Sequence, residues 1–302
     1  MVWGWQIAWY LFLGGLGAGA TLTSLVASRS GSRFAAIERA GATLAGPAVA
    51  FGTALLVVDL GAGRREPWRL VYLYLNWQSP MTWGTWILTL FIPIALLHAL
   101  SVTGALAPRW ERYVASVRQV CVRAQSALKV AAGVLALSTA IYTGVLLSVP
   151  PSFPLLSSWL LPVLFLVSAL STGLSAAVVV GYVLARRRGV ELDLHQWSRI
   201  HIGLLVVELA ALIAWLGVGS ASQAGGASVQ LLVSGALAPV FWGGVVVAGL
   251  VAPVLAFVVE TAPRGHSCRL ALAGEAGVLA GGLALRYLVL LAAVPVLVGP
   301  AL

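Results

Sequence analysis

Eight long apolar stretches, separated by short polar connections, constrain this chain more than any other feature of its sequence. They span approximately residues 5–28, 40–58, 83–107, 128–149, 158–185, 200–219, 229–259 and 270–298. A helix needs about 20 apolar residues to cross the hydrocarbon core of a bilayer. Because 60% of the 302 residues are hydrophobic and only 9% are charged, an ordinary soluble domain is excluded. The sequence predicts an all-α integral membrane protein, in which residues 1–302 form one domain of eight transmembrane helices.

Two patterns inside these stretches predict local structure. Stretch 229–259 is longer than one span requires, and Pro239 and Pro253 within it indicate a kinked or tilted helix. Glycines stand four residues apart near the start of the chain and again near its end: Gly15 and Gly19, and Gly277 and Gly281. This spacing lets helix backbones approach closely, so these glycines are expected at helix–helix contacts.

The basic residues predict the orientation in the membrane. The loops after the odd-numbered stretches carry fourteen of them: Arg29, Arg33, Arg39, Arg109, Arg112, Arg118, Arg123, Lys129, Arg186, Arg187, Arg188, Arg199, Arg264 and Arg269. The opposite side has three, Arg64, Arg65 and Arg69, and the remaining Arg286 lies within the last stretch. Because basic loops stay in the cytoplasm, the excess predicts a multi-pass protein of the cytoplasmic membrane with both termini extracytoplasmic.

The segment Asp59–Trp86 is the one charged loop expected on the outer side, and it is rich in aromatic residues. A loop must lie in water or against protein, because its backbone polar groups cannot face lipid. We interpret this segment as a docking surface that also roofs a site beneath it. Trp77, Trp83 and Trp86 either line the entrance to that site or belong to the interfacial aromatic belt.

Polar side chains inside the apolar stretches are costly and indicate function or specific bonding. Counting about 1.5 Å per helical residue sorts them by depth. An outer group consists of Gln6, Tyr10, Asp59, Tyr142 and Arg286. It is either a small-molecule site or a set of hydrogen bonds between helices. Glu208 and His98 lie deeper, with Glu275 near the inner surface; they form a proton path, or a protonated Glu208 bonds a neighbouring helix.

Metal centres have little support in the sequence. The two cysteines are too few for the usual three or four ligands of a metal site. A b-type haem needs histidines on facing helices, and only His98 lies deep in a stretch, so that a pair with His201 is the remaining haem alternative. We expect neither haem nor metal in this chain. A secondary transporter is the other alternative, although no internal repeat supports it.

Four stretches together resemble a known family. They are WQIAWYLFLGGLGAGA (5–20), DLG followed by EPWR and SPMTWGTWIL (59–88), YTGVLLS (142–148) with the following PLLSSWLLPVLFLVSALSTG, and GGLALRYLVL (281–290). Their content and order resemble the NrfD/polysulfide reductase membrane subunits, which are quinone-interacting anchors of molybdopterin oxidoreductases. The resemblance extends over the whole chain.

The resemblance implies a haem-free protein built as two four-helix bundles. It implies a [4Fe–4S] ferredoxin-like partner on the extracytoplasmic face and a molybdopterin catalytic subunit. A quinone, menaquinone or ubiquinone, is then bound by Tyr142 of the YTG motif together with Gln6 and Tyr10. Asp59, Arg286 and Trp83 complete the expected site.

The predicted function is that of a membrane anchor that exchanges electrons between the quinone pool and the iron–sulfur subunit. Such an anchor is non-catalytic alone, or is the quinone-reactive subunit of an oxidoreductase complex. Proton translocation through Glu208, His98 and Glu275 is a second hypothesis.

Overall fold

The computed structural model describes residues 4–31, 34–60, 67–103, 108–190, 194–262 and 268–295, and all regular structure in these ranges is helical. The elements are α1 (Trp5–Ala27), α2 (Ala35–Asp59), the 3₁₀ helix η2 (Pro67–Tyr74), α4 (Pro80–Thr103), α5 (Pro108–Arg123), α6 (Gln125–Ser148), α7 (Leu160–Arg187), α8 (His195–Gly219), α9 (Gln223–Val233), α10 (Ala238–Val240), the π-helical segment η3 (Phe241–Val251), α11 (Ala252–Thr261) and α12 (Cys268–Leu291).

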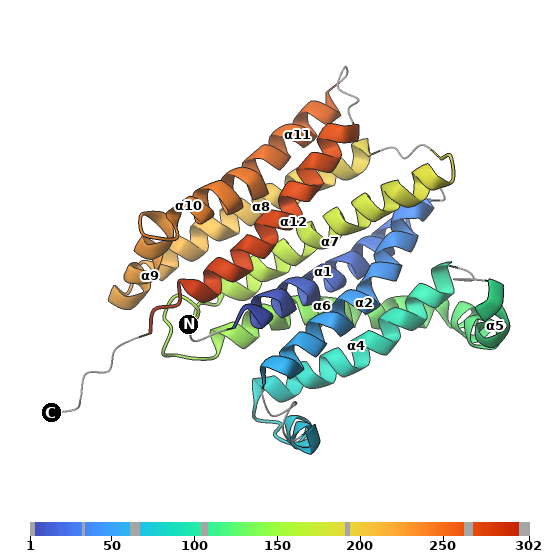
Figure 1. Ribbon diagram of the computed structural model, residues 1–302, viewed down its shortest axis with the longest axis horizontal. Coiled ribbons are helices and arrows are strands. Elements are labelled where there is room, and N and C mark those ends of the chain that lie inside the picture. Colours follow the sequence, from blue (N-terminus) through green and yellow to red (C-terminus); the bar gives the residue numbers. More distant parts are fainter. Residues whose placement is uncertain are drawn as a thin grey trace.

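Eight helices of the described ranges are long and apolar enough to cross a membrane, as the sequence predicts. They are α1, α2, α4, α6, α7, α8, the continuous run Ala238–Thr261 and α12. Successive spans run in opposite directions, and Figure 1 shows η2 and α5 at opposite ends of the bundle. We call these the η2 end, where α1 begins, and the α5 end. Residues 61–66 of the expected outer loop lie outside the described ranges.

The spanning helices contact one another in two closed rings that meet at α1 and α7. In the first ring α1 contacts α2, α2 contacts α4, α4 contacts α6, and α6 contacts α1. In the second ring α7, α8, α11 and α12 follow one another in the same way. Helix α7 also packs against α1, α2 and α6, and α12 packs against α1. Figure 1 accordingly shows α1 and α7 side by side in the middle of the bundle.

Helices α1 and α7 are the most buried spans. Of their most apolar windows, 78% and 72% are buried, against 28–56% for the other spans. Small residues make this possible, because their two backbones touch: a Cβ atom placed at Gly19 would lie 3.0 Å from the Cα of Gly173. The predicted close contact at Gly19 is therefore confirmed, and it holds the two rings together.

The glycines of α12 serve the same purpose against η3. A Cβ at Gly277 would lie 2.5 Å from the Ala248 carbonyl oxygen, and one at Gly249 would lie 2.7 Å from the Cα of Gly281. The predicted packing role of Gly277 and Gly281 is confirmed. The π-helical winding of η3 ends where Pro253, which has no amide hydrogen to donate, enters α11.

Two elements differ from the sequence prediction. Stretch 229–259 is divided between α9 and a separate span from Ala238, because a turn over residues 234–237 separates them. Residues 108–123, expected as a basic loop, form α5, in which Val117 is exposed and Cys121 is buried four residues later. Apolar residues recur there at helical spacing among the arginines, which gives an amphipathic helix.

Candidate functional site

The phenol of Tyr142 lies directly against the backbone of Gly84. Tyr142 is on α6 and is 7% exposed, whereas Gly84 is near the start of α4 in the SPMTWGTW segment. A Cβ atom at Gly84 would overlap the ring and the hydroxyl of Tyr142. The glycine therefore sets the position of the phenol, and this contact joins two of the motifs quoted above.

Tyr10 of α1 is fully buried, and α1 packs against α6, the helix that carries Tyr142. The Tyr10 hydroxyl has no hydrogen-bond partner among the described residues. A buried hydroxyl without a partner is unfavourable by about 1–3 kcal/mol, so such groups are normally satisfied by water or a ligand. Here the Tyr10 hydroxyl is a donor that is free to bond an incoming polar group.

Gln6 and Asp59 meet at the η2 end of the first ring. Both side-chain oxygens lie where a side chain at Gly4 would be. A Cβ atom at Gly4 would lie 2.7 Å from Asp59 Oδ1 and at a shorter distance from Gln6 Oε1. Gln6 is in the first turn of α1, one turn before Tyr10, and Asp59 is the last residue of α2. The two polar groups are half-buried and lie nearer the η2 end than the phenols.

Arg286 of α12 is fully buried between α7 and α1. Its Nη1 donates to Ser168 Oγ at 2.7 Å and to the Gly282 carbonyl at 2.9 Å. The guanidinium lies 5.3 Å from the ring centre of Phe165 and 5.9 Å from that of Phe12. Its Nε and Nη2 atoms have no partner among the described residues.

Helix α1 separates Arg286 from the phenols. A Cβ at Gly15 would lie 3.1 Å from Arg286 Nη2, so the guanidinium faces the Gly15 side of α1. Gly15 follows Tyr10 by five residues, which is about 140° around the helix. Four of the five residues of the expected outer group thus lie on the first-ring side of α1, and Arg286 lies on the second-ring side.

The deeper acidic residues are bonded within the second ring. Glu208 of α8 accepts a 2.6 Å hydrogen bond from Ser171 of α7. Glu275 of α12 pairs with His201 of α8, whose Nδ1 lies 3.1 Å from Oε2 and 3.3 Å from Oε1. Both pairs are buried, and the His201 ring stacks on Phe257.

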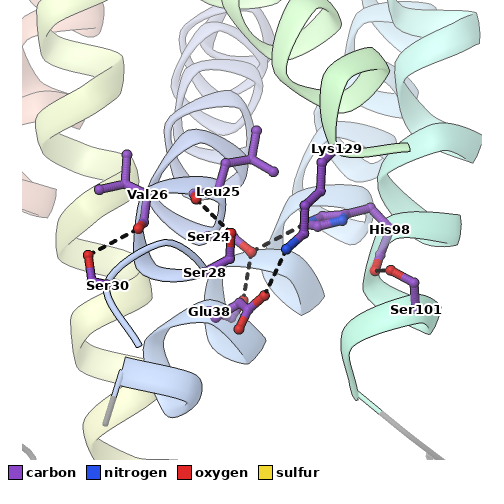
Figure 2. Close-up of polar contacts among 9 residues, drawn as sticks. All are labelled: Ser24, Leu25, Val26, Ser28, Ser30, Glu38, His98, Ser101 and Lys129. Carbon is purple, nitrogen blue, oxygen red and sulfur yellow. Dashed lines mark hydrogen bonds and ion pairs between the residues drawn. The ribbon is translucent and has the colours of Figure 1, made fainter. Parts of the chain in front are cut away.

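His98 lies in the first ring, away from Glu208. Figure 2 shows it beside Ser24, with the Lys129–Glu38 ion pair (3.6 Å) close by. Ser24 donates to the Glu38 carbonyl at 2.8 Å, and His98 Nε2 is 3.3 Å from Ser24 Oγ. Since the single Ser24 hydrogen is used, Nε2 must carry the proton that His98 donates.

Trp83 belongs to an exposed aromatic cluster at the η2 end. Its indole is 54% exposed and donates to the Trp77 carbonyl at 3.0 Å. Trp77 packs edge-on against Trp83 and parallel to Trp86, and Tyr74 packs edge-on against Trp86. We call Tyr74, Trp77, Trp83 and Trp86 the aromatic rim.

The sequence interpretation missed the hydroxyl groups that accompany the ionisable residues. Ser168, Ser171, Thr172 and Ser175 are all fully buried on α7. Their spacing of three and four residues within an apolar span is the signal that identifies one polar face of a helix. The partner of Glu275 is also absent from the expected site, because His201 is the second residue of stretch 200–219 and so stands next to a loop in the sequence.

The comparison with known proteins decides the family. Residues 1–298 match the family model described as polysulphide reductase, NrfD. The chain belongs to the NrfD family. Its membership, together with the eight apolar helices, makes it a multi-pass membrane protein.

Three NrfD-family relatives match most of the sequence. The C subunit of polysulfide reductase from Wolinella succinogenes is 33% identical over 97% of this sequence and 94% of its own length. The protein NrfD of Escherichia coli is 30% identical over 97% of this sequence and 95% of its own. A protein NrfD homolog of Haemophilus influenzae is 28% identical over 85% and 83%. The resemblance of the four sequence motifs to this family is thereby confirmed.

Proposed function

We propose that this NrfD-family protein is the membrane anchor of a multi-subunit oxidoreductase, where it exchanges electrons between a membrane quinone and an iron–sulfur subunit. The observation that carries the proposal is the pair of buried phenols, Tyr10 and Tyr142, one of which has no partner among the described residues. The name of the Wolinella relative, a subunit of polysulfide reductase, supports membership of a reductase complex.

The phenols suit a quinone because its carbonyl oxygens accept hydrogen bonds and gain negative charge as electrons arrive. Reduction to the quinol consumes two electrons and two protons. A phenol held against the carbonyl donates a hydrogen bond to the charge that develops there. Gly84 keeps Tyr142 in place, while Gln6 and Asp59 supply further polar groups toward the η2 end. Arg286 supports the site from the other side of α1, at Gly15.

The η2 end is the proposed seat of the partner. Electrons must travel a short distance from a cluster to the quinone, and the phenols lie below this end. The distribution of basic residues supports an extracytoplasmic location for the η2 end. The aromatic rim, with three indoles more than a third exposed, offers the apolar anchor residues typical of protein interfaces. The partner is a [4Fe–4S] ferredoxin-like subunit, joined by a molybdopterin catalytic subunit.

Replacing Tyr142 with phenylalanine tests this function. The expected result is a fall in quinol-dependent turnover of roughly 100-fold, the typical effect of losing one donor to a developing oxyanion, with unchanged assembly of the complex. Tyr287→Phe is the matched control, because Tyr287 is exposed on α12. Equal turnover in the two variants would remove Tyr142 from the mechanism.

Proton movement from the cytoplasm is the second part of the proposal, and it assigns Glu208, His98 and Glu275 to that movement. All three are buried ionisable groups within spans. In vesicles that contain the complex, Glu208→Gln should lower the number of protons taken up per electron. An unchanged ratio would exclude Glu208.

A further inference from the structure

A continuous polar face runs along α7 through the second ring. Ser168, Ser171, Thr172 and Ser175 follow one another at spacings of three, one and three residues, and each is 0% exposed. The hydroxyls of Ser168 and Ser171 reach across to Arg286 and Glu208. Ser175 lies one turn farther toward the α5 end, and its Oγ has no partner among the described residues.

The His201–Glu275 pair continues this face toward the α5 end. His201 and Glu208 are both on the buried side of α8, seven residues and about 10 Å apart. Ser175 follows Ser171, the partner of Glu208, by about 6 Å along α7, which runs antiparallel to α8. Its depth is therefore between those of the two acidic pairs.

Several atoms along this path have unused hydrogen-bonding capacity. Besides Ser175 Oγ, they are His201 Nε2 and the Nε and Nη2 atoms of Arg286. Buried polar atoms without protein partners are normally bonded to internal water, and a series of hydroxyls, carboxylates and waters can pass protons. The Glu275 carboxylate only accepts hydrogen bonds, so His201 Nδ1, which faces it, carries the donated hydrogen. His201 Nε2 is then the ring nitrogen that can take up a proton.

Helix α4, as far as it is described, offers no comparable path from His98 toward the η2 end. Between His98 and Gly84, the buried positions of α4 are Ala95, Phe91 and Leu88, all apolar. His98 instead bonds Ser24 beside the Lys129–Glu38 pair. On α4, apolar side chains therefore lie between His98 and Gly84.

We propose that Ser175 and His201 are proton-conducting residues: the His201–Glu275 pair takes up protons from the α5 end and passes them through Ser175 and bound water to Glu208. We call this path the α7 column. The proton enters at His201 Nε2 and leaves to the Glu208 carboxylate, with no redox change.

Other ionisable groups lie near His201 toward the α5 end. Phe257, which stacks on His201, belongs to α11, and the one ionisable residue of α11, Glu260, lies a turn nearer the α5 end. Arg186, Arg187 and Tyr182 of α7 and Arg269 of α12 are the other ionisable groups of the packed helices toward that end.

The inference extends the proposed function, but its test needs no quinone turnover. The protonation of Glu208 is followed by time-resolved infrared spectroscopy of the assembled complex after a pH jump, using the carboxyl band that Glu208→Gln removes. Ser175→Val and His201→Gln should each slow the appearance of this band by about tenfold or more, since either closes the path. Ser175→Ala, which leaves room for water, should slow it less. Ser101→Ala, which removes a buried hydroxyl of α4 outside this path, is the control and should leave the rate unchanged.

Three results would overturn the α7 column. They are an unchanged rate in Ser175→Val and His201→Gln, an equal slowing in Ser101→Ala, or a Glu208 carboxyl that does not titrate. Should Ser175→Val fail to assemble, Ser175→Ala and His201→Gln decide the question. If the α7 column is overturned while Tyr142→Phe still lowers quinol turnover, the proposed quinone function remains. If Tyr142→Phe has no effect on turnover while Ser175→Val and His201→Gln slow the protonation of Glu208, the α7 column remains.

Discussion

The ring of Tyr142 occupies the space that a side chain at Gly84 would need. One motif on α6 and one on α4 are therefore a single structural unit, in which a glycine determines where a phenol points. Gly84 therefore affects the position of one hydroxyl group of the proposed quinone site.

Gly84→Ala should displace the Tyr142 ring without adding or removing a polar group. We expect quinol turnover to fall by roughly tenfold or more, with a raised KM for quinol, because the donor moves away from the carbonyl. Gly203→Ala is the control, since no atom lies within 4 Å of a Cβ there. Steady-state kinetics of the assembled complex measure the effect, and equal kinetics in the two variants would contradict the assigned contact.

Tyr10→Phe should weaken quinone binding without lowering the stability of the quinone-free protein. Removing a buried hydroxyl that lacks a partner should leave thermal stability without quinone unchanged, or raise it by about 1 kcal/mol. Added quinone should then stabilise the variant less than the wild type, because the free donor is lost. Thermal unfolding in detergent, with and without quinone, measures both. Marked destabilisation of the quinone-free variant would show that the hydroxyl is bonded within the protein.

Ser168 and Arg286 should be energetically coupled. Ser168→Ala leaves a buried guanidinium hydrogen without its acceptor, at a cost of about 1–3 kcal/mol. In the double variant with Arg286→Met, the loss should be smaller than the sum of the two single losses. Ser101, a buried serine of α4, provides the uncoupled control. Additive losses for Ser168 and Arg286 would mean that their 2.7 Å bond contributes nothing to stability.

Trp83→Ala should weaken the attachment of the partner subunit while leaving the bundle folded. Exposed tryptophans are frequent anchors of interfaces, and losing one typically costs about 2 kcal/mol, or roughly 30-fold in Kd. Trp242→Ala is a matched control: Trp242 is 48% exposed and likewise donates to a backbone carbonyl, that of Val233. Subunit dissociation after dilution measures the effect. Equal dissociation of the two variants would move the docking surface away from the aromatic rim.

The spans were predictable from the sequence because bilayer thickness fixes their length and apolar character. Their close contacts were predictable as well, since Gly19, Gly277 and Gly281 stand at helix-packing spacings and do touch neighbouring backbones. The helix α5 was not, because its arginines suggested a loop and concealed its helical periodicity.

The sequence does not show which helices are neighbours in the plane of the membrane. Counting residues gives depth, which puts His98 and Glu208 at one level and Tyr10 and Arg286 in the outer half. Depth says nothing about which neighbours a helix has. Once α4 is in the first ring and α8 in the second, His98 bonds Ser24 and Glu208 bonds Ser171. Likewise, Tyr10 and Arg286 lie on different sides of α1, and this can be recognised only when the helices on both sides of α1 are known.

The most direct measurement is a density map of the native complex purified with its quinone. We predict an iron–sulfur subunit bound to the η2 end over the aromatic rim. A quinone head group should lie beneath it, with a carbonyl about 3 Å from the hydroxyl of Tyr142 or Tyr10. A partner bound to the arginine-rich α5 end, or a quinone bound away from both phenols, would contradict the proposed function.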